Sequence, residues 1–409
     1  MPSLAEYAPI VGDSTIEELR DLAKRLAGCR VAMVNSTRVG GGVAEILERM
    51  VPLLEELGLR VRWEVIEGSE PFYRVPKAFH NALHGKQETI TPEMFQLFLD
   101  VGRRNAERLV LDDDIVFIHD PQPITLVEQR RQDQTSRWIW RCHVDVSRPL
   151  QAVWKFLQPF ILKFDSAVYS SSAFAQQMPM EQILIAPSID PLSDKNRDLA
   201  PEEIDAILQR LSVPRDRPMI TQVSRFDYLK DPLGVIEAFR RVRKSVKARL
   251  VLAGGSASDD PEGEEVLNRV REAAKGNPDI HLLMLPPNSN IEINALQRAS
   301  AVVVQKSIRE GFGLTVSEAL WKARPVVASA VGGIPLQVKH RYSGLLVHSV
   351  EGAAYAIKQL LSNPEYAKRL GEKGREHVRQ NFLLTRHLRD YLLMFLTLGS
   401  AEDAVYLNS

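Results

Sequence analysis

The sequence predicts an α/β protein made of two doubly wound domains with parallel sheets. Short, continuously apolar runs alternate with amphipathic helical patterns along most of the 409 residues. This alternation is typical of parallel strands that helices cover on both faces. A chain of this length is too long for one ordinary core. A stretch rich in Pro, Ser and Asp, Ala186–Asn196, interrupts the alternation near the middle. We therefore expect one domain over residues 1–190 and a second over residues 191–383.

The first half opens with a helix and continues with strands and helices in turn. Ser14 and Glu17 have the S-x-x-E spacing of a capping box, which predicts a helix start. Arg30–Asn35 has the composition of a buried strand. A helix from Val43 places its apolar residues on one face and ends at Gly58. Further strands are expected at Arg60–Val65, Ile115–His119, Trp138–His143 and Ser166–Ser170.

The second half repeats the scheme. Strands are expected at Met219–Ser224, Ala248–Gly254, Ile280–Leu285, Ser300–Gln305 and Pro325–Ser329, with helices between them. A strongly apolar helix is expected over Leu383–Leu398. Ligands of doubly wound folds bind outside the carboxyl ends of the strands. Polar residues that directly follow a strand are therefore the candidate site residues.

Composition excludes several classes of function. Lys and Arg together number 52, as do Asp and Glu, so the formal net charge is zero, and no nucleic-acid partner is expected. The two cysteines, Cys29 and Cys142, fit no metal-ligand spacing and indicate a reducing compartment. The sequence shows no signal peptide and no membrane span, so a cytoplasmic protein without a membrane partner is expected. No metal-binding motif and no nucleophile elbow appears, so no metal site is predicted.

A glycine turn, Gly40-Gly41-Gly42, follows the strand that ends at Asn35. Glycines at this position let a ligand approach the backbone, and amides at a helix start attract anions. The dinucleotide pattern G-x-G-x-x-G is incomplete here, which argues against a nicotinamide dehydrogenase. A tight strand-to-helix turn without a ligand is the alternative interpretation.

A second candidate segment, Ser224–Asp231 (SRFDYLKD), directly follows a strand. It carries Arg225 near its start and Lys230 near its end. Two cations near the carboxyl end of a strand suit a diphosphate. The alternative is an Arg and a Lys on a solvated loop.

A third segment, Ser307–Lys322 (SIREGFGLTVSEALWK), carries two carboxylates separated by seven residues. Glu310 lies in the loop before a helix, and the amides of Phe312 to Thr315 are candidate anion donors at the helix start. Glu318 lies one turn into the helix, where a carboxylate can accept bonds from two ribose hydroxyls. A nucleotide sugar would span such a segment. The alternatives are a helix-start charge for Glu310 and an ordinary surface position for Glu318.

Two strand ends in the first half also carry polar residues. HDPQP (His119–Pro123) and RCHVD (Arg141–Asp145) place Asp120 and His143 where they could orient hydroxyl groups. A structural histidine is the alternative for His143. VGGIP (Val331–Pro335) is a further glycine turn after a strand of the second half.

These segments together resemble a known family. EGFGLTVSE, QVSRFDYLKDPLGVIEAF and VGGIP look like the motifs of the retaining nucleotide-sugar glycosyltransferases of family 4. That family has the GT-B fold, with two Rossmann-like domains facing a deep cleft. The chain is more similar still to the trehalose glycosyl-transferring synthases, over roughly residues 30 to 390. The quoted stretches are VNSTRVGGGVAEIL, FHNALHG, HDPQP, WIWRCHVDVS, PSIDPLSDKN and SIREGFGLTVSEALWK.

The resemblance implies roles for individual residues. Arg225 and Lys230 would hold the diphosphate, and Glu310 would contact the donor glucose; these three are the predicted catalytic residues. The predicted donor-binding residues are Gly41, Gly42, His143, Gly311, Phe312, Gly313, Leu314, Thr315 and Glu318. The predicted acceptor-binding residues are Asn81, Asp120 and Gln122. By the same resemblance, a C-terminal helix over residues 384–409 joins the N-terminal, acceptor-side domain, and residues 191–383 form the nucleotide-sugar donor domain.

The implied activity is that of a retaining hexosyltransferase. It would move glucose from a nucleoside diphosphate glucose, such as UDP-glucose or ADP-glucose, to free glucose, giving trehalose and nucleoside diphosphate reversibly. No cofactor is required, Mg²⁺ is an accessory ion at most, and a homodimer is expected. The stretch Ser170–Met178 departs from the group by being small and polar. The alternatives are a trehalose phosphorylase, another family 4 enzyme with a different acceptor, a sugar-nucleotide epimerase, and a non-catalytic sugar-nucleotide sensor.

Overall fold

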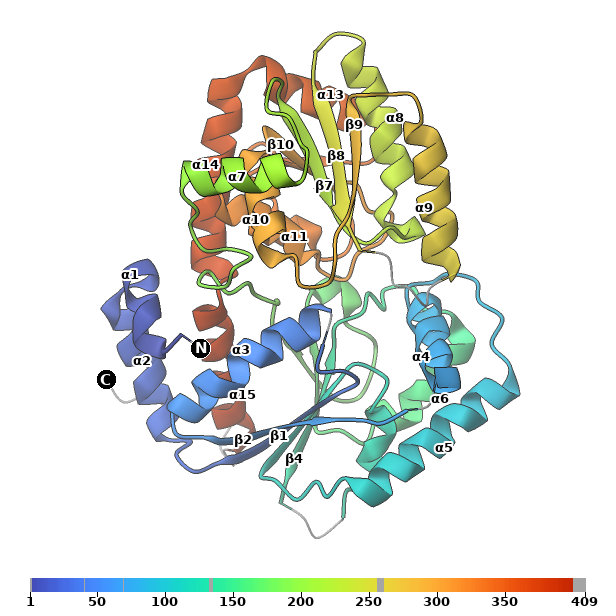
Figure 1. The fold of residues 1–409 in the computed structure, drawn as a ribbon. Coiled ribbons are helices and arrows are strands. Elements are labelled where there is room, and N and C mark those ends of the chain that lie inside the picture. Colours follow the sequence, from blue (N-terminus) through green and yellow to red (C-terminus); the bar gives the residue numbers. More distant parts are fainter. Residues whose placement is uncertain (1, 40, 69, 132–134, 256–260, 400–409) are drawn as a thin grey trace. The chain divides into compact units, whose positions relative to one another are not determined.

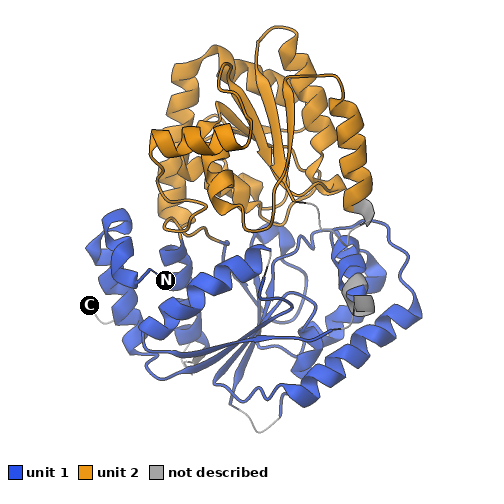
Figure 2. Cartoon of the chain, in the orientation of Figure 1, with its two compact units in different colours: residues 1–187, 384–409 blue, residues 188–383 orange. Residues whose placement is uncertain are grey.

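The computed structural model of the chain describes residues 2–39, 41–68, 70–131, 135–255 and 261–399 (Figure 1). The chain divides into two compact units, one of residues 1–187 with 384–409 and one of residues 188–383 (Figure 2). Each unit is built on a six-stranded sheet in which all neighbouring strands are parallel. The prediction of two parallel-sheet α/β domains is therefore confirmed.

The sheet of the first unit has the strand order β2-β1-β3-β4-β5-β6. Its strands are β1 (Arg30–Asn35), β2 (Arg60–Val65), β3 (Ile115–His119), β4 (Arg137–Cys142), β5 (Ser166–Tyr169) and β6 (Glu181–Leu184). The first five match the predicted strands to within one residue at each end. Because β3 and β4 are neighbours, with His119 beside Arg141 in register, the loops that follow them start side by side.

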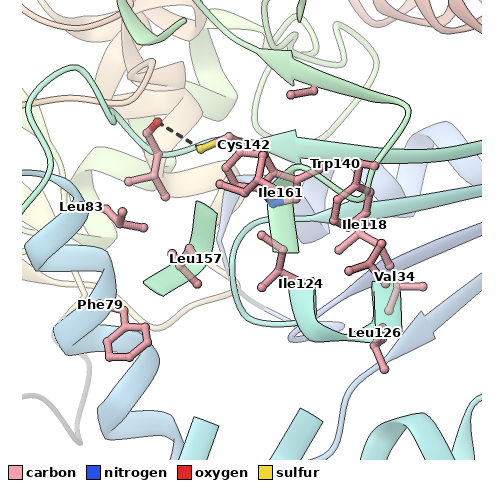
Figure 3. Packing of buried hydrophobic residues seen from close by; sticks show 14 of the residues in the cluster. Val34, Phe79, Leu83, Ile118, Ile124, Leu126, Trp140, Cys142, Leu157 and Ile161 are labelled. Atoms are coloured by element: carbon pink, nitrogen blue, oxygen red, sulfur yellow. Dashed lines mark hydrogen bonds between the residues drawn. The ribbon is translucent and has the colours of Figure 1, made fainter. Parts of the chain in front are cut away.

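Helices cover both faces of this sheet. On one face, apolar side chains of the strands pack against α4 (Glu70–Leu83), α5 (Pro92–Arg108), α6 (Gln151–Ile161) and the 3₁₀ helix η2 (Ile124–Gln129). Figure 3 shows this cluster, in which Trp140 and Ile118 of the strands lie with Leu157 of α6 and Ile124 of η2. Burial of this apolar surface is the main stabilising term for the unit.

The other face is associated with α2 (Asp13–Lys24), α3 (Gly42–Glu56) and α15 (Leu384–Gly399), and α15 contacts both of the other two helices. Tyr391 of α15 packs edge-on against Phe117 of β3, with ring centroids 5.1 Å apart. Shorter elements of this unit are η1 (Leu4–Tyr7), α1 (Ala8–Val11) and η3 (Ser172–Phe174).

The predicted capping box at Ser14 is wrong. The helix begins one residue earlier, at Asp13, and its N-cap is Gly12. Gly12 has a φ of 90°, in the left-handed region, because the chain turns there between α1 and α2. The turn between two helices, rather than a side-chain cap, sets this helix start.

The sheet of the second unit has the strand order β12-β11-β10-β7-β8-β9. Its strands are β7 (Met219–Val223), β8 (Arg249–Gly254), β9 (Ile280–Met284), β10 (Val302–Gln305), β11 (Val326–Ser329) and β12 (Leu345–Val347). Its helices are α7 (Pro201–Arg210), η4 (Tyr228–Lys230), α8 (Pro232–Arg243), α9 (Pro261–Ala274), α10 (Asn290–Ala299), α11 (Leu314–Trp321), α12 (Ile334–Gln337), α13 (Val350–Ser362) and α14 (Pro364–Asn381). Since β7, β10 and β11 are adjacent, the three loops that leave their carboxyl ends start together.

Two of the four edge strands, β6 and β12, were not predicted from the sequence. β12 has only three residues, and β6 has an exposed residue at each of its two ends, so neither gives the buried apolar run on which the prediction relied. Within the described ranges, the helices all fall short of the length and apolar character needed to cross a membrane.

Candidate functional site

An ion pair in the second unit joins two of the predicted catalytic residues. The Nζ of Lys230 donates to both carboxylate oxygens of Glu310, at 2.8 and 2.7 Å. Ser307 Oγ donates to Oε2 of the same carboxylate at 3.0 Å, and Gln305 Nε2 lies 3.4 Å from it. Glu310 is only 7% exposed. The structure therefore holds this carboxylate and this ammonium in one fixed, largely buried arrangement.

The protonation of Glu310 follows from two opposing effects. Burial raises the pKa of its carboxyl group. The charge of Lys230 and the hydrogen bonds from Lys230, Ser307 and Gln305 lower this pKa, and together they outweigh the effect of burial. The net pKa is below the ordinary value for glutamate, so Glu310 is ionised at neutral pH. It can accept hydrogen bonds from sugar hydroxyls, and it has no proton to donate.

The loops after β7 and β10 are bound to each other at several points. The amide of Ile308 donates to the carbonyl of Leu229 at 2.7 Å, and Lys306 forms an ion pair with Asp231. Gln222 Nε2 donates to the carbonyl of Lys230 at 2.8 Å. These bonds fix the backbone on both sides of the Lys230–Glu310 pair.

The glycine turn after β11 supports the same loop. Gly332 has a φ of 55°, and a Cβ there would overlap the carbonyl oxygen of Glu310. The amide of Gly333 donates to the carbonyl of Gly311 at 3.1 Å. Only a residue without a side chain allows this approach. The turn VGGIP therefore acts by holding the backbone of the Glu310 loop in place.

The predicted donor-binding segment 311–315 leads from this loop into α11. Gly313 is the N-cap of α11 with a φ of 82°, and no side chain caps this helix start. Phe312 is buried and packs against Phe382, with ring centroids 5.6 Å apart. Gly311, Gly313, Leu314 and Thr315 are partly exposed. Phe312 thus anchors the segment, while its neighbours keep accessible surface.

Glu318 is not an ordinary surface residue, because it is only 4% exposed. Lys195 Nζ lies 3.8 Å from its Oε1. Lys322, the C-cap residue of the same helix, donates to the carbonyl of Glu318 at 3.1 Å and to Asn196 Oδ1 at 2.9 Å. Burial lowers the pKa of Lys322 to about 7, although the nearby Glu318 carboxylate acts in the opposite direction. Sequence analysis missed both lysines as part of this site.

Arg225 lies apart from the Lys230–Glu310 pair. Its side chain is 62% exposed and forms an ion pair with Asp227 at 3.1 Å. Asp227 Oδ1 in turn accepts the amide of Lys230 at 3.1 Å. The structure therefore places Arg225 on the same loop as Lys230 but in water.

In the first unit, Asp120 and His143 lie together at the ends of β3 and β4. Asp120 Oδ1 accepts the amide of His143 at 2.8 Å, and the amide of Asp120 donates to the carbonyl of Arg141 at 2.7 Å. Burial raises the pKa of Asp120 to about 7, although the hydrogen bond from His143 and the charge of Arg141 act to lower it. His119 Nδ1 lies 3.1 Å from His143 Nε2. Sequence analysis missed His119 and Arg141 because both read as ordinary strand residues.

The remaining predicted residues of this unit are not joined to that group by the bonds of the described chain. Asn81 Nδ2, on α4, donates to Glu88 Oε1 at 2.9 Å. The side-chain oxygen of Gln122 is buried and accepts no hydrogen bond from a described residue. Gly41 is the N-cap of α3 and Gly42 its first residue, whereas Gly40 lies outside the described residues. Gln122 therefore has an acceptor available for a ligand hydroxyl.

Among the residues that the structure describes, no three His, Cys, Asp or Glu side chains are grouped so that they could hold a metal ion. The side chains at the site offer ion pairs and hydrogen bonds.

Comparison with known proteins finds a matching family for each of the two units. Residues 33–176 match the family described as trehalose synthase, N-terminal domain, and residues 203–377 match glycosyl transferases group 1. A trehalose synthase of Rubrobacter xylanophilus is 47% identical over 97% of this chain and 97% of its own length. A trehalose phosphorylase of Pleurotus pulmonarius is 28% identical over 92% of this chain, which corresponds to 58% of its own length.

Among solved structures, a UDP-forming α,α-trehalose-phosphate synthase of Burkholderia xenovorans has a similar fold. Its TM-score is 0.74 at 16% sequence identity, over 91% of this chain and all of the other. The two Rossmann-like units thus have the GT-B fold, as the sequence resemblance implied.

Proposed function

Because the chain belongs to the trehalose synthase family of glycosyltransferases, we propose that it transfers glucose from a nucleoside diphosphate glucose to free glucose. The products are α,α-1,1-linked trehalose and the nucleoside diphosphate, with retention at the donor carbon. The observation that carries the proposal is the largely buried Lys230–Glu310 pair at the carboxyl ends of β7 and β10. Ligands of doubly wound sheets bind at this edge.

Lys230 and Glu310 have complementary roles in this reaction. As the bond between glucose and the diphosphate breaks, negative charge grows on the leaving phosphate, and the Lys230 ammonium stabilises it. A charge that is held in place before the reaction begins is the most effective form of such stabilisation. The ionised Glu310 accepts hydrogen bonds from hydroxyls of the transferred glucose and so fixes the reacting carbon relative to Lys230.

Arg225 supplies a second cation for the diphosphate. Its side chain is exposed and is held by an ion pair with Asp227. An exposed pair of this kind contributes about 0–1 kcal/mol, so little free energy opposes a change of partner. Arginine binds two phosphate oxygens at once, which favours a diphosphate over a single phosphate.

Glu318 serves the other end of the donor. Glu318 is largely buried, with Lys195 Nζ 3.8 Å from its carboxylate, and a carboxylate has two oxygens that can accept both hydroxyls of a ribose. The partly exposed residues of segment 311–315 lie between Glu310 and Glu318 and contact the diphosphate or the sugar. This order along the chain matches a nucleotide sugar laid along β10 and α11.

In the first unit, His143, Asp120, Gln122 and Asn81 serve the sugars, and Gly41 and Gly42 give a ligand access to the backbone at the start of α3. The reaction requires no cofactor from these residues, and Mg²⁺ enters only as an accessory ion on the diphosphate. Assays with and without a chelator test that point. The protein is further proposed to be a homodimer, which light scattering measures directly.

The decisive experiment gives the full chain glucose together with UDP-, ADP- or GDP-glucose, and reads the products by NMR. Formation of α,α-trehalose and free nucleoside diphosphate supports the proposal and ranks the donors. Trehalose from glucose 1-phosphate and glucose, with no product from any nucleotide donor, would replace it with the phosphorylase reaction. Donor consumption without a disaccharide would point to a different acceptor.

A further inference from the structure

Two histidines in the first unit form a direct contact that the proposed chemistry does not yet use. His119 ends β3, and its Nδ1 lies 3.1 Å from Nε2 of His143, which follows β4. The two rings are nearly parallel, at 18°, with centroids 5.5 Å apart. His119 is 1% exposed, whereas His143 keeps part of its surface accessible. Within the described chain, Nδ1 of His143 makes no hydrogen bond, so it is available to a ligand.

Both rings are neutral at physiological pH. Burial lowers the pKa of His119 to about 3, and the charge of Arg141 acts in the same direction. Burial, Arg141 and His119 hold the pKa of His143 well below its usual value. A neutral imidazole has one N–H and one lone pair. When two such rings share a hydrogen bond, one must donate and the other accept, so the tautomer of one fixes the tautomer of the other.

The position and charge of Arg141 indicate which of the two histidines donates this hydrogen bond. It is the register partner of His119 on β4, and none of its surface is exposed. Its NH2 donates to the carbonyl of Ile185 at 2.6 Å, while its Nε and NH1 donate to no described residue. The Nε2 of His119 and the hydroxyl of Tyr391 likewise have no hydrogen-bond partner among the described residues.

These surroundings are rich in donors and positively charged. The charge of Arg141 acts on His119 and favours a lone pair on Nε2, whereas the other tautomer would place its N–H there, where no described residue accepts it. With the lone pair on Nε2, the proton of His119 lies on Nδ1 and is donated to Nε2 of His143. His143 must then carry its own proton on Nδ1, the nitrogen left for a ligand.

We propose that His119 is a positioning residue that holds His143 as the Nδ1–H tautomer, so that His143 donates a hydrogen bond to a hydroxyl oxygen of the bound glucose. In this state His143 presents no lone pair to the substrate and does not act as a base. The identity of the ligand rests on the proposed function, but the tautomer does not. The two ideas can therefore fail separately.

The test uses the full chain with ¹⁵N-labelled histidine, because the ¹⁵N shift of each ring nitrogen reports whether it carries a proton. The signals of His143 are assigned by their loss in His143→Gln. The expected spectrum of the unsubstituted protein has a protonated Nδ1 and an unprotonated Nε2 on His143. An unprotonated Nδ1 would overturn the inference.

Substitutions at His119 test its positioning role. His119→Phe keeps the ring but removes the donor, so the His143 signals shift toward a tautomer mixture and kcat/KM falls about tenfold, the effect of one hydrogen bond. His119→Asn places an amide N–H where Nδ1 was, and restores both the His143 signals and most of the rate. His281→Phe, in the other unit, is the control that leaves the His143 signals unchanged.

His143 signals that stay the same in His119→Phe would overturn the positioning role. If the unsubstituted protein makes no trehalose but shows the expected tautomer, only the proposed function fails. If it makes trehalose with the opposite tautomer, only this inference fails.

Discussion

Replacing Glu310 by Gln tests the central pair of the proposed site. The change keeps the size of the side chain and removes its charge. In the structure the carboxylate accepts two bonds from Lys230, at 2.8 and 2.7 Å, and one from Ser307 at 3.0 Å. Glutamine retains one acceptor oxygen, but its amide N–H groups would face the Lys230 ammonium. The variant therefore leaves a largely buried cation without its counter-charge.

The expected cost in stability follows from that loss. Removing one partner of a buried ion pair costs about 3–5 kcal/mol. The Lys230 side chain keeps 17% exposure and can turn partly to water, which places the expected loss at the lower limit of this range, about 3 kcal/mol. The pKa of Glu310 is lower in the folded protein than in the unfolded chain. The contribution of the ionised Glu310 to the free energy of unfolding is therefore fully present above the ordinary pKa of glutamate, and it is lost as the pH falls through the pKa that Glu310 has in the folded protein.

The effect on catalysis should be larger than the effect on nucleotide binding. Losing a group that positions the reacting sugar is expected to lower kcat about 10²–10³-fold. Affinity for the free nucleoside diphosphate should stay the same or rise, because Lys230 is released toward the phosphates. Single-turnover rates and calorimetric titration with UDP or ADP measure the two quantities, and urea unfolding at pH 7 and pH 4 measures the stability.

Glu237→Gln is the matched control, because Glu237 forms a half-exposed pair with Arg241 on α8. It should change stability by less than about 1 kcal/mol and leave kcat unaltered. An unchanged kcat in Glu310→Gln, or equal losses in kcat and in nucleotide affinity, would refute the role assigned to Glu310.

Three further predictions concern the surroundings of the pair. Gly332→Ala should lower the free energy of unfolding in urea by about 3 kcal/mol, because the added Cβ would overlap the carbonyl oxygen of Glu310. Gly58 is the control: it also has a positive φ, but no atom lies within 4 Å of an added Cβ, so Gly58→Ala should lower the free energy of unfolding by only about 1 kcal/mol. Lys322 has a pKa of about 7 in the folded protein against an ordinary value of about 10.4, so between these two values the folded state binds fewer protons than the unfolded state and the free energy of unfolding should rise with pH. Lys322→Met should flatten this rise in urea unfolding, and an unchanged slope would contradict the lowered pKa of Lys322. Arg225→Gln should raise the KM for the nucleotide donor about tenfold without lowering the melting temperature, since the side chain is 62% exposed; a normal KM would remove Arg225 from the site.

The sequence predicts well those strands and helices that are marked by neighbouring residues in the chain. β1, β2 and β3 are apolar runs between clear turn residues, and their predicted bounds coincide with the structure. β6 and β12 give no such run, because β6 begins with Glu-Gln and is exposed at both ends, and β12 has only three residues. The start of α2 depends on a turn between helices, which a capping pattern does not encode.

Some residues of the candidate site could likewise be predicted from the sequence, and others could not. Lys230 and Glu310 could be found because each lies in a segment that follows a strand, and the sheet order brings these segments together. His119 and Arg141 could not, since they lie within strands and their importance comes from a neighbouring strand and from α15. Lys322 carried a usable signal, its position four residues after Glu318 on one helix face, whereas Lys195 comes from a distant loop.

The return of the chain to the first unit has a consequence for its synthesis. Residues 188–383 form one uninterrupted unit that can fold as soon as it leaves the ribosome. The first unit, although its other residues are made first, lacks α15 until residues 384–399 have been made. Until then the ring of Phe117 has no Tyr391 beside it, and the carbonyl of Ala186 has no Arg386 to bond. The amino-terminal half of the chain is therefore the last to reach its native state.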